Sequence, residues 1–418
     1  MAGGSSCRRR RRKSRGTRWL NATALAESIG DGVARQVLPI VAVSVLGAGA
    51  GLVGVLNSLG LAAFLLLSFP IGVLADRRGN PLRFMGLGTL VRAEVAVVGV
   101  LLWGTGLLTA WGGLAALVAM AAVVGTADVA FTTGQGLLVP RLVEPQQIRW
   151  VYGRVQAMTQ GGGAAAPLLV AGVLLLAPVP VAWIGAAAAY LISAAAQRRI
   201  GPLTPMRPPV RSSLWAEAER GIGHLFGQPL LARVTVANAL SNAAVMGANT
   251  LLPVIALSEV GVAPAAFAAI GAAAAVCGMA GAAMAARISE RVGLRLTRVA
   301  VASAMVVGNG LVIGTLAGAL PGRPEIWLVI QAAIAGAGSA IAMVAGSDLP
   351  ARLVSAGQLG AVMGAQRAIV LGAMPVAALT FGGLAVTLGL LPTAWVWLAL
   401  TLSSVIPCLQ LTDGPSQR

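Results

Sequence analysis

GVLADRRGNPLR, residues 72–83, is a charged turn between two long apolar segments of the chain. The segments beside it, residues 50–74 and 84–107, are each long enough to cross a bilayer as a helix, which takes about 20 apolar residues. Such a turn joins two consecutive membrane-spanning helices and keeps its arginines outside the hydrocarbon. This stretch therefore predicts a helical membrane protein.

The composition supports that prediction along the whole chain. Of the 418 residues, 57% are hydrophobic and only 10% are charged, and the mean hydropathy is +0.84. A soluble protein this apolar could not cover its surface with polar groups. The composition therefore excludes an ordinary soluble enzyme. The three cysteines have neither a metal-site spacing nor a disulfide pattern, so no metal is expected.

Twelve apolar stretches of spanning length lie between Gly, Pro and Arg residues. They predict an all-α fold of twelve transmembrane helices in two pseudo-symmetric bundles of six. The predicted spans are 19–46, 50–74, 84–107, 112–138, 152–176, 179–197, 231–257, 264–287, 297–318, 325–346, 359–385 and 390–411. The predicted parts are a basic tail at 1–18, a first bundle at 19–197, a central loop with an amphipathic helix at 198–230, a second bundle at 231–411 and a tail at 412–418.

The basic residues mark one side of the predicted membrane protein. The chain has 30 Lys and Arg against 13 Asp and Glu. The basic residues of the loops lie in every second loop, and these loops are on the same side of the predicted membrane as both chain ends. The loops on the other side hold a single basic residue, Arg323. This asymmetry is the positive-inside pattern, so we expect a multi-pass protein of the cell membrane with both termini in the cytoplasm.

The basic tail RRRRRK, residues 8–13, has three interpretations. It could bind nucleic acid or begin a signal peptide. The apolar run that follows does not favour a signal peptide, because it contains Asn21 and Thr23 and its helix continues to Gly47. We interpret the tail as a polybasic flank held near anionic lipid, which predicts the bilayer as a partner and no nucleic acid.

The two predicted bundles repeat each other in sequence. LPIVAVS at residues 38–44 returns as LPVIALS at 252–258, and LADRRG at 74–79 is answered by ISERVG at 288–293. Further matches follow in the same order along the chain. Because each copy holds an even number of helices, the copies have the same orientation and are related by an axis along the membrane normal. This architecture encloses a cavity between two bundles.

The turn at 72–83 resembles the signature of the major facilitator superfamily, and the helix count, the duplicated halves and the central loop fit the same family. The resemblance implies the major facilitator fold and alternating access. It also implies a gating motif, here called the latch, that ties the two halves together on the cytoplasmic side. One departure is Asn80, which stands where the family often has a basic residue. The latch residues are Gly72, Asp76, Arg77, Gly79 and Arg83, with Glu290, Arg291 and Gly293 in the degenerate second copy.

The latch makes a testable prediction. Asp76 at a helix end can accept hydrogen bonds from a neighbouring helix N-terminus or pair with an arginine. Asp76→Asn should therefore leave the protein inserted in the membrane and slow its transport. The initial rate of transport at matched membrane abundance measures the effect. Normal turnover in this variant would remove the latch role and leave the arginines as orientation signals alone.

The central stretch also resembles one branch of that superfamily, which contains enterobactin exporters and macrolide-efflux permeases. The residues that carry this likeness are LWAE at 214–217, GI at 221–222, QPLL at 228–231 and NAL at 238–240. The antiporter signature of the fifth helix is degraded to Ala166-Pro167 followed by Gly172. Export is the implied direction, and this departure leaves import open.

Ionisable residues inside the predicted spans mark the candidate coupling site. Glu27, Asp31 and Arg35 are spaced by four and share one face of the first helix, and Asp128 lies at a similar depth in the fourth. Placing a charged side chain in hydrocarbon costs at least about 2.5–3.5 kcal/mol, so each of these residues is expected to have a structural or functional role. Two neighbouring carboxylates repel, so one should hold a proton near neutral pH. The alternative is a structural Asp31–Arg35 ion pair. Arg92 in the third helix is interpreted as a partner for another helix.

The second bundle lacks such acids and offers amides instead. Asn238, Asn242 and Asn249 project from one face of the seventh predicted span. They suit hydrogen bonding to a substrate in the cavity. Interhelical hydrogen bonding is the equal alternative.

These features predict a secondary active transporter. The leading interpretation is a proton-coupled efflux antiporter of a drug-like or siderophore-like compound. Its expected partners are protons and a small organic substrate, and it is expected to be a monomer without a cofactor. A proton-coupled importer of a small nutrient and a transport-inactive scaffold or receptor are the alternatives. An enzyme is not expected, because the sequence has no phosphate loop, metal cluster or nucleophile elbow. No catalytic residue is therefore assigned.

Overall fold

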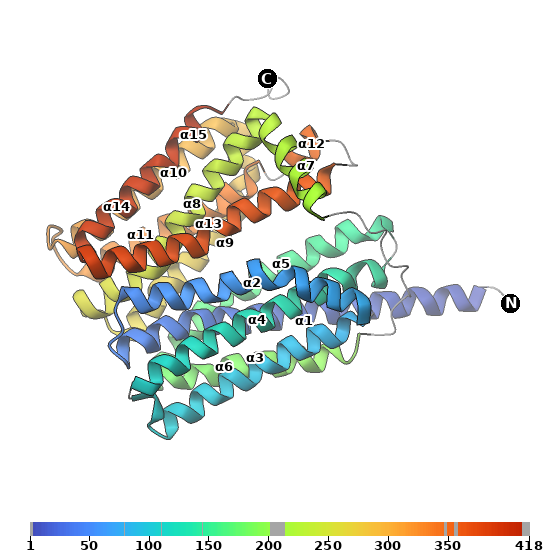
Figure 1. The fold of residues 1–418 in the computed structure, drawn as a ribbon, viewed down its shortest axis with the longest axis horizontal. Helices are drawn as coiled ribbons and strands as arrows, with labels where there is room; N and C mark the ends of the chain where they lie inside the picture. Colours follow the sequence, from blue (N-terminus) through green and yellow to red (C-terminus); the bar gives the residue numbers. More distant parts are fainter. Residues whose placement is uncertain are drawn as a thin grey trace. The chain divides into compact units, whose positions relative to one another are not determined.

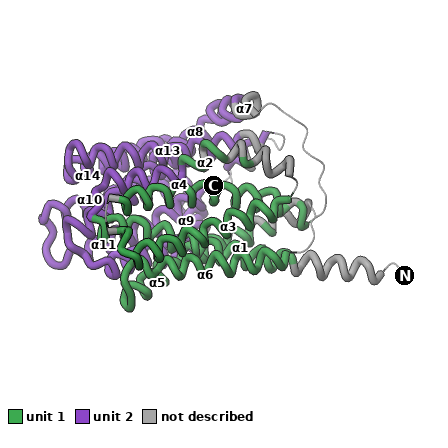
Figure 2. The backbone as a smooth tube through the Cα atoms, turned by 60° about the horizontal axis from the view of Figure 1, so that its bottom comes forward, with its two compact units in different colours: residues 1–46, 62–209 green, residues 47–61, 210–418 purple. Residues whose placement is uncertain are grey.

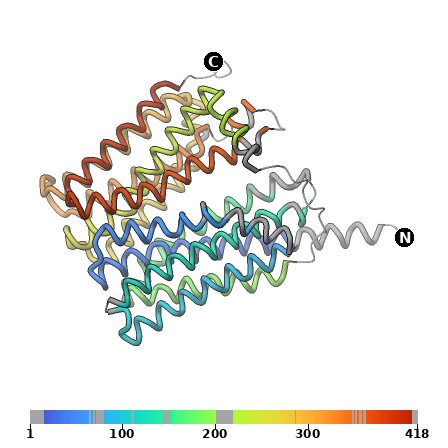
Figure 3. Tube along the Cα trace, viewed as in Figure 1, coloured from blue at the N-terminus to red at the C-terminus, as the bar shows by residue number. Residues whose placement is uncertain are grey.

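The computed structural model describes residues 3–78, 80–109, 111–143, 145–200, 214–346, 349–354 and 358–411. Within these ranges every regular element is a helix (Figures 1 and 3). The long helices are α1 (Gly3–Ser44), α2 (Ala50–Arg78), α3 (Pro81–Gly104), α4 (Trp111–Leu142), α5 (Pro145–Leu174), α6 (Ala182–Gln197), α8 (Pro229–Val254), α9 (Pro264–Val292), α10 (Leu294–Leu316), α11 (Pro324–Val344), α13 (Leu359–Leu388) and α14 (Leu390–Ser403). The shorter ones are η1 (Leu107–Thr109), η2 (Val179–Val181), α7 (Leu214–Gly227), η3 (Ile255–Glu259), α12 (Leu349–Leu353) and α15 (Val405–Leu409).

Helix coincides with each of the twelve predicted spans, so the predicted all-α membrane fold is confirmed. Within the described ranges, 10 helices are long and apolar enough to cross a membrane. The other two predicted spans lie in α1, which carries Glu27, Asp31 and Arg35, and in α2, which contributes the apolar segment Ala50–Ala63. α1 begins at Gly3, well before residue 19, because the arginine-rich tail has good helix formers and no proline.

The described chain falls into two compact units (Figure 2). Unit 1 is Met1–Leu46 and Ala62–Pro209, and unit 2 is Gly47–Leu61 and Val210–Arg418. The start of α2 therefore groups with the second half of the chain. A Cβ added at Gly54 would overlap the carbonyl oxygen of Ala378 on α13, which shows how closely these backbones approach.

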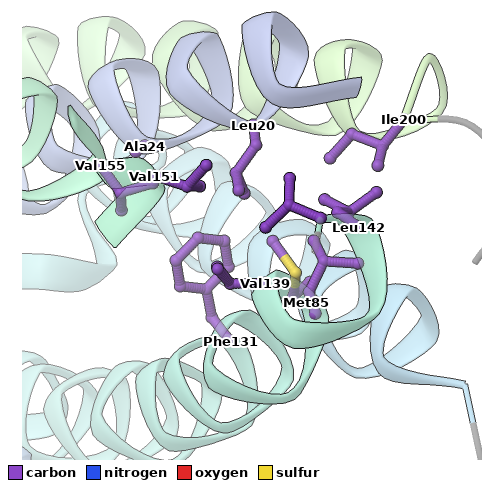
Figure 4. Close-up of a cluster of buried hydrophobic side chains, with 11 residues drawn as sticks. Leu20, Ala24, Met85, Phe131, Val139, Leu142, Val151, Val155 and Ile200 are labelled. Atoms are coloured by element: carbon purple, nitrogen blue, oxygen red, sulfur yellow. The ribbon is translucent and has the colours of Figure 1, made fainter. Parts of the chain in front are cut away.

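Unit 1 is held together by a buried apolar cluster from α1, α3, α4 and α5 (Figure 4). Leu20, Met85 and Leu138 are fully buried in it, and the ring of Phe131 packs against them. Small residues bring the backbones together, since a Cβ at Gly88 of α3 would overlap the carbonyl oxygen of Ala127 on α4. These contacts position the charged side chains described below.

The amphipathic segment predicted in the central loop is the helix α7. Leu225 is fully buried in a cluster with Val362 and Ala365 of α13, whereas Ile222 and Phe226 are exposed. One apolar side of α7 thus packs on unit 2.

Candidate functional site

The guanidinium of Arg92 is the centre of a charge cluster in unit 1. Its side chain is fully buried, at 0% exposure, in the middle of α3. Nη1 donates to Oδ1 of Asp31 at 2.6 Å and lies 3.4 Å from Oδ1 of Asp128, and Nη2 pairs with Oε1 of Glu27. Nε donates to the carbonyl oxygen of Gly88. The structure therefore brings together three of the acids predicted from the sequence around one arginine.

Close backbone contacts place these side chains. Gly88 lets α3 approach α4, which carries Asp128, at the level of Ala127. A Cβ at Gly30 of α1 would lie 2.7 Å from the ring of Tyr190, so glycine is needed there for α6 to pack against α1. Glu27 and Asp31 are one turn apart on α1 and both face Arg92.

Uncharged groups complete the cluster. The Tyr190 hydroxyl donates to Oδ1 of Asp31 at 2.8 Å, and the Thr89 hydroxyl donates to Oε1 of Glu27 at 3.1 Å. Gln197 donates in turn to the Thr89 oxygen at 2.8 Å. The rings of Phe131 and Tyr190 lie 5.0 and 5.1 Å from the guanidinium of Arg92, within cation–π distance.

Arg35 has a different partner from the one considered in the sequence analysis. Its Nη2 lies 3.4 Å from Oδ2 of Asp128, and its side chain is 70% exposed. Asp31 instead pairs with Arg92. The interpretation of Arg92 as a partner for other helices agrees with its ion pairs to α1 and α4.

The balance of charge gives the cluster its chemistry. Among the described residues, three carboxylates face two guanidinium groups, so one negative charge of this set is unmatched when all five groups are ionised. Placing an unmatched charge away from water is costly, and a bound proton or a cation removes that cost. This arrangement can therefore take up and release a proton. Within the described ranges, no set of His, Cys, Asp and Glu is placed to hold a metal ion.

Sequence reasoning did not find the uncharged partners Thr89, Tyr190 and Gln197. Arg92 has a sequence signal, since a basic residue in an apolar span is rare. Tyr190 and Gln197 have none, because aromatic and amide residues are common in such helices. Their roles follow only from the way α6 packs against α1 and α3.

The predicted latch is only partly within the described residues. Gly79 lies outside them, and Gly72, Asp76 and Arg77 lie in the part of α2 whose side chains are not described. Arg83, Glu290 and Arg291 are exposed. Gly293 follows α9 with a φ of 87°, a conformation that suits glycine at a helix end. The latch stays a prediction.

The three asparagines of the second half have separate surroundings. Oδ1 of Asn238 accepts a hydrogen bond from Nη1 of Arg298 at 2.6 Å. Asn249 is exposed, and its carbonyl oxygen accepts from Nδ2 of Asn57 at 3.1 Å. Asn242 is half-buried. The contact with Arg298 fits the interhelical alternative for Asn238.

The fold is similar to that of solved transporter structures. A crystal structure of the nucleoside transporter NupG aligns over 95% of this chain and 98% of its own, at 13% identity and a TM-score of 0.72. For the peptide transporter POT in complex with sulfate, the coverage is 96% of each chain, the identity 16% and the TM-score 0.67. A crystal structure of a bacterial homologue of the iron transporter ferroportin in an inward-facing state aligns over 95% of this chain and 98% of its own. The sequence identity is 16% and the TM-score 0.66. At these identities the likeness shows the fold alone.

The sequence itself matches a family model over most of its length. Residues 20–373 match the model of the Major Facilitator Superfamily. A search of curated protein sequences found no match. The family match covers the cluster around Arg92, nearly all of the predicted first half and most of the second. The chain therefore belongs to the Major Facilitator Superfamily, a family of multi-pass secondary transporters of the membrane rather than of enzymes.

Proposed function

We propose that this transporter exports a drug-like or siderophore-like organic compound in exchange for protons, and that the cluster around Arg92 is its proton-coupling site. The observation that supports this proposal is the unmatched negative charge among Glu27, Asp31 and Asp128. A cluster of ionisable residues inside a membrane bundle is energetically costly, which favours a functional role for it. An ion gradient is the energy source of a secondary transporter.

The proton exchanges at Asp31 or Asp128. Both carboxylates accept from the same Nη1 of Arg92, at 2.6 and 3.4 Å. Their side chains are 22% and 23% exposed, whereas that of Glu27 is 3% exposed. Glu27 is therefore the permanent partner of Arg92, and the two aspartates are the groups that water can reach.

Protonation of one aspartate alters how the helices are held. If Asp31 is neutralised, Nη1 of Arg92 has Asp128 on α4 as its remaining charged partner. If Asp128 is neutralised, Arg92 stays with α1 and Arg35 loses its acid. Each state favours a different set of contacts among α1, α3 and α4. Such a two-state element is what coupling between proton binding and helix movement requires.

Export is the direction that follows from the resemblance to efflux permeases, with both termini in the cytoplasm. Proton-coupled import of a small nutrient is a second candidate, because the structural neighbours include a nucleoside transporter and a peptide transporter. A transport-inactive scaffold would not explain why charged residues are present inside the membrane bundle. We propose that the protein works as a monomer, with six spans on either side of the central loop.

A comparison of cells and medium identifies the substrate and the direction. Wild type and Asp31→Asn are expressed at matched membrane abundance, and metabolites and added test compounds are measured on both sides. A compound depleted in wild-type cells and enriched outside establishes export. The reverse distribution establishes import and overturns the proposed direction.

The coupling site is then tested in proteoliposomes under an imposed pH gradient. Asp31→Asn and Asp128→Asn should each reduce pH-driven transport of that compound at least about tenfold, since neutralising the acid removes the exchangeable proton. Glu94→Gln is the matched control, because Glu94 is an exposed acid on α3 outside the cluster. Unchanged pH dependence in both aspartate variants would overturn the assignment.

A further inference from the structure

Unit 2 contains a pocket of its own, with a volume of about 430 Å³. Its walls come from α8, from the start of α10, from the end of α11, from α12 and from α13. The polar groups that line it are Asn238, Arg298, Gln366 and Arg367, and Val234 and Met343 supply apolar surface. A volume of this size suits a small organic molecule.

Arg298 is the buried cation of this pocket. The residue is 5% exposed, and its Nε and Nη2 donate to the carbonyl oxygen of Ala345 at 3.1 and 2.5 Å. Its Nη1 donates to Oδ1 of Asn238 at 2.6 Å. All of these acceptors are uncharged. Within the described ranges, no Asp or Glu forms an ion pair with Arg298.

This environment differs from that of Arg92. Arg92 is surrounded by three carboxylates, whereas among the described residues the hydrogen-bond acceptors of Arg298 are a carbonyl and an amide oxygen. A buried guanidinium is costly unless a negative charge compensates it. Ala345 caps the C-terminal end of α11, and the partial negative charge of that helix end offsets part of the cost.

Capping α11 does not account for the rest of the pocket. Arg367 and Gln366 line the same pocket and belong to α13 rather than to α11. They add a second guanidinium and an amide to the lining of the pocket, and Nε2 of Gln366 donates to the Thr235 hydroxyl oxygen at 3.1 Å. Two arginines and two amides around one cavity are groups that suit a carboxylate or phosphate, which guanidinium groups recognise in bidentate geometry.

We propose that this pocket of unit 2 binds the anionic group of the transported compound, with Arg298 and Arg367 as its countercharges. The inference rests on the proposed transport function and adds a substrate class, an organic anion with a carboxylate or phosphate group. The same chemistry is offered by an anionic lipid headgroup. The two sources are separated by experiment.

The experiment measures binding to the purified full-length protein in a neutral detergent by isothermal titration calorimetry. The first pair of probes is 2-naphthoate and its uncharged analogue 2-naphthamide. The second pair is dihexanoylphosphatidylglycerol and dihexanoylphosphatidylcholine. We expect the naphthoate to bind at least about tenfold more tightly than the amide, because only the carboxylate pairs with the arginines. Binding of the phosphatidylglycerol alone would assign the site to lipid and overturn the proposal.

Variants locate the site. Arg298→Gln and Arg367→Gln should each weaken naphthoate binding at least about tenfold. Arg367 is an exposed residue of α13, so its variant is informative even where Arg298→Gln fails to fold. Arg233→Gln is the matched control, since Arg233 also donates to a carbonyl oxygen, that of Gln410, outside the pocket. Wild-type affinity in both pocket variants would overturn the assignment.

Two further variants separate this proposal from its alternatives. Asp348 follows Ala345, the residue that accepts from Arg298, by three positions in the sequence and lies outside the described residues. Naphthoate binding that appears only in Asp348→Asn would show that this carboxylate already compensates Arg298, and would overturn the proposal. Asp31→Asn should keep naphthoate binding, because no proton gradient is involved. Unchanged proton coupling in this variant, with anion binding intact, would count against the coupling site alone.

Discussion

Replacing Arg92 by methionine should lower the free energy of unfolding by about 3–5 kcal/mol, the range measured when one partner of a buried ion pair is removed. Methionine keeps much of the volume of the side chain but leaves Glu27 and Asp31 facing each other without a cation. The Thr89 and Tyr190 hydroxyls still donate to these acids, which offsets only part of the loss. Unfolding of the detergent-purified protein by denaturant, followed by circular dichroism, measures the change.

A double variant separates lost charge from lost packing. Glu27→Gln combined with Arg92→Met removes the arginine and its most buried partner together, and should be less destabilised than Arg92→Met alone. Glu94→Gln, an exposed change on the same helix, should have an effect within about 0.5 kcal/mol. A single variant Arg92→Met as stable as wild type would show that the cluster contributes nothing to the fold.

The helices of this protein could be predicted from its sequence because apolar length is a strong signal in lipid. A span must satisfy its backbone groups internally, so about 20 apolar residues specify a helix with little ambiguity. Glu27, Asp31 and Asp128 stand out for the same reason, since a charge within such a run is rare. The family resemblance rests on the charged turn at 72–83 and on the internal repeat.

The pairing of the charges could not be predicted in the same way. Arg35 is one turn from Asp31 on α1, yet it reaches Asp128, while Asp31 is held by Arg92 and Tyr190. Which of these contacts forms depends on the rotation of each helix about its axis. In helices rich in Ala and Gly, the apolar pattern is nearly the same on every face, so sequence periodicity does not define that rotation.

Close backbone contacts decide the rotation instead. The glycine side of α9 packs on the glycine side of α11, where a Cβ at Gly336 would overlap the carbonyl oxygen of Ala274. A Cβ at Gly281 would likewise lie 2.7 Å from the carbonyl oxygen of Ala337. Backbone atoms on both sides leave no flexible side chain to move away. The contact between α9 and α11 is thus possible only with glycine at these positions.

Gly336→Val should accordingly destabilise unit 2 by about 3 kcal/mol, the upper part of the usual range for overpacking, because α9 and α11 must separate to admit the side chain. The loss should appear as a lower denaturant midpoint for the purified protein. Gly310→Val is the matched control on α10, where an added Cβ meets nothing within 4 Å, and its midpoint should stay near that of wild type. Equal midpoints for the two variants would mean that the separation of α9 and α11 is not set by glycine. In that case the rotation of these helices would have to come from their polar contacts instead.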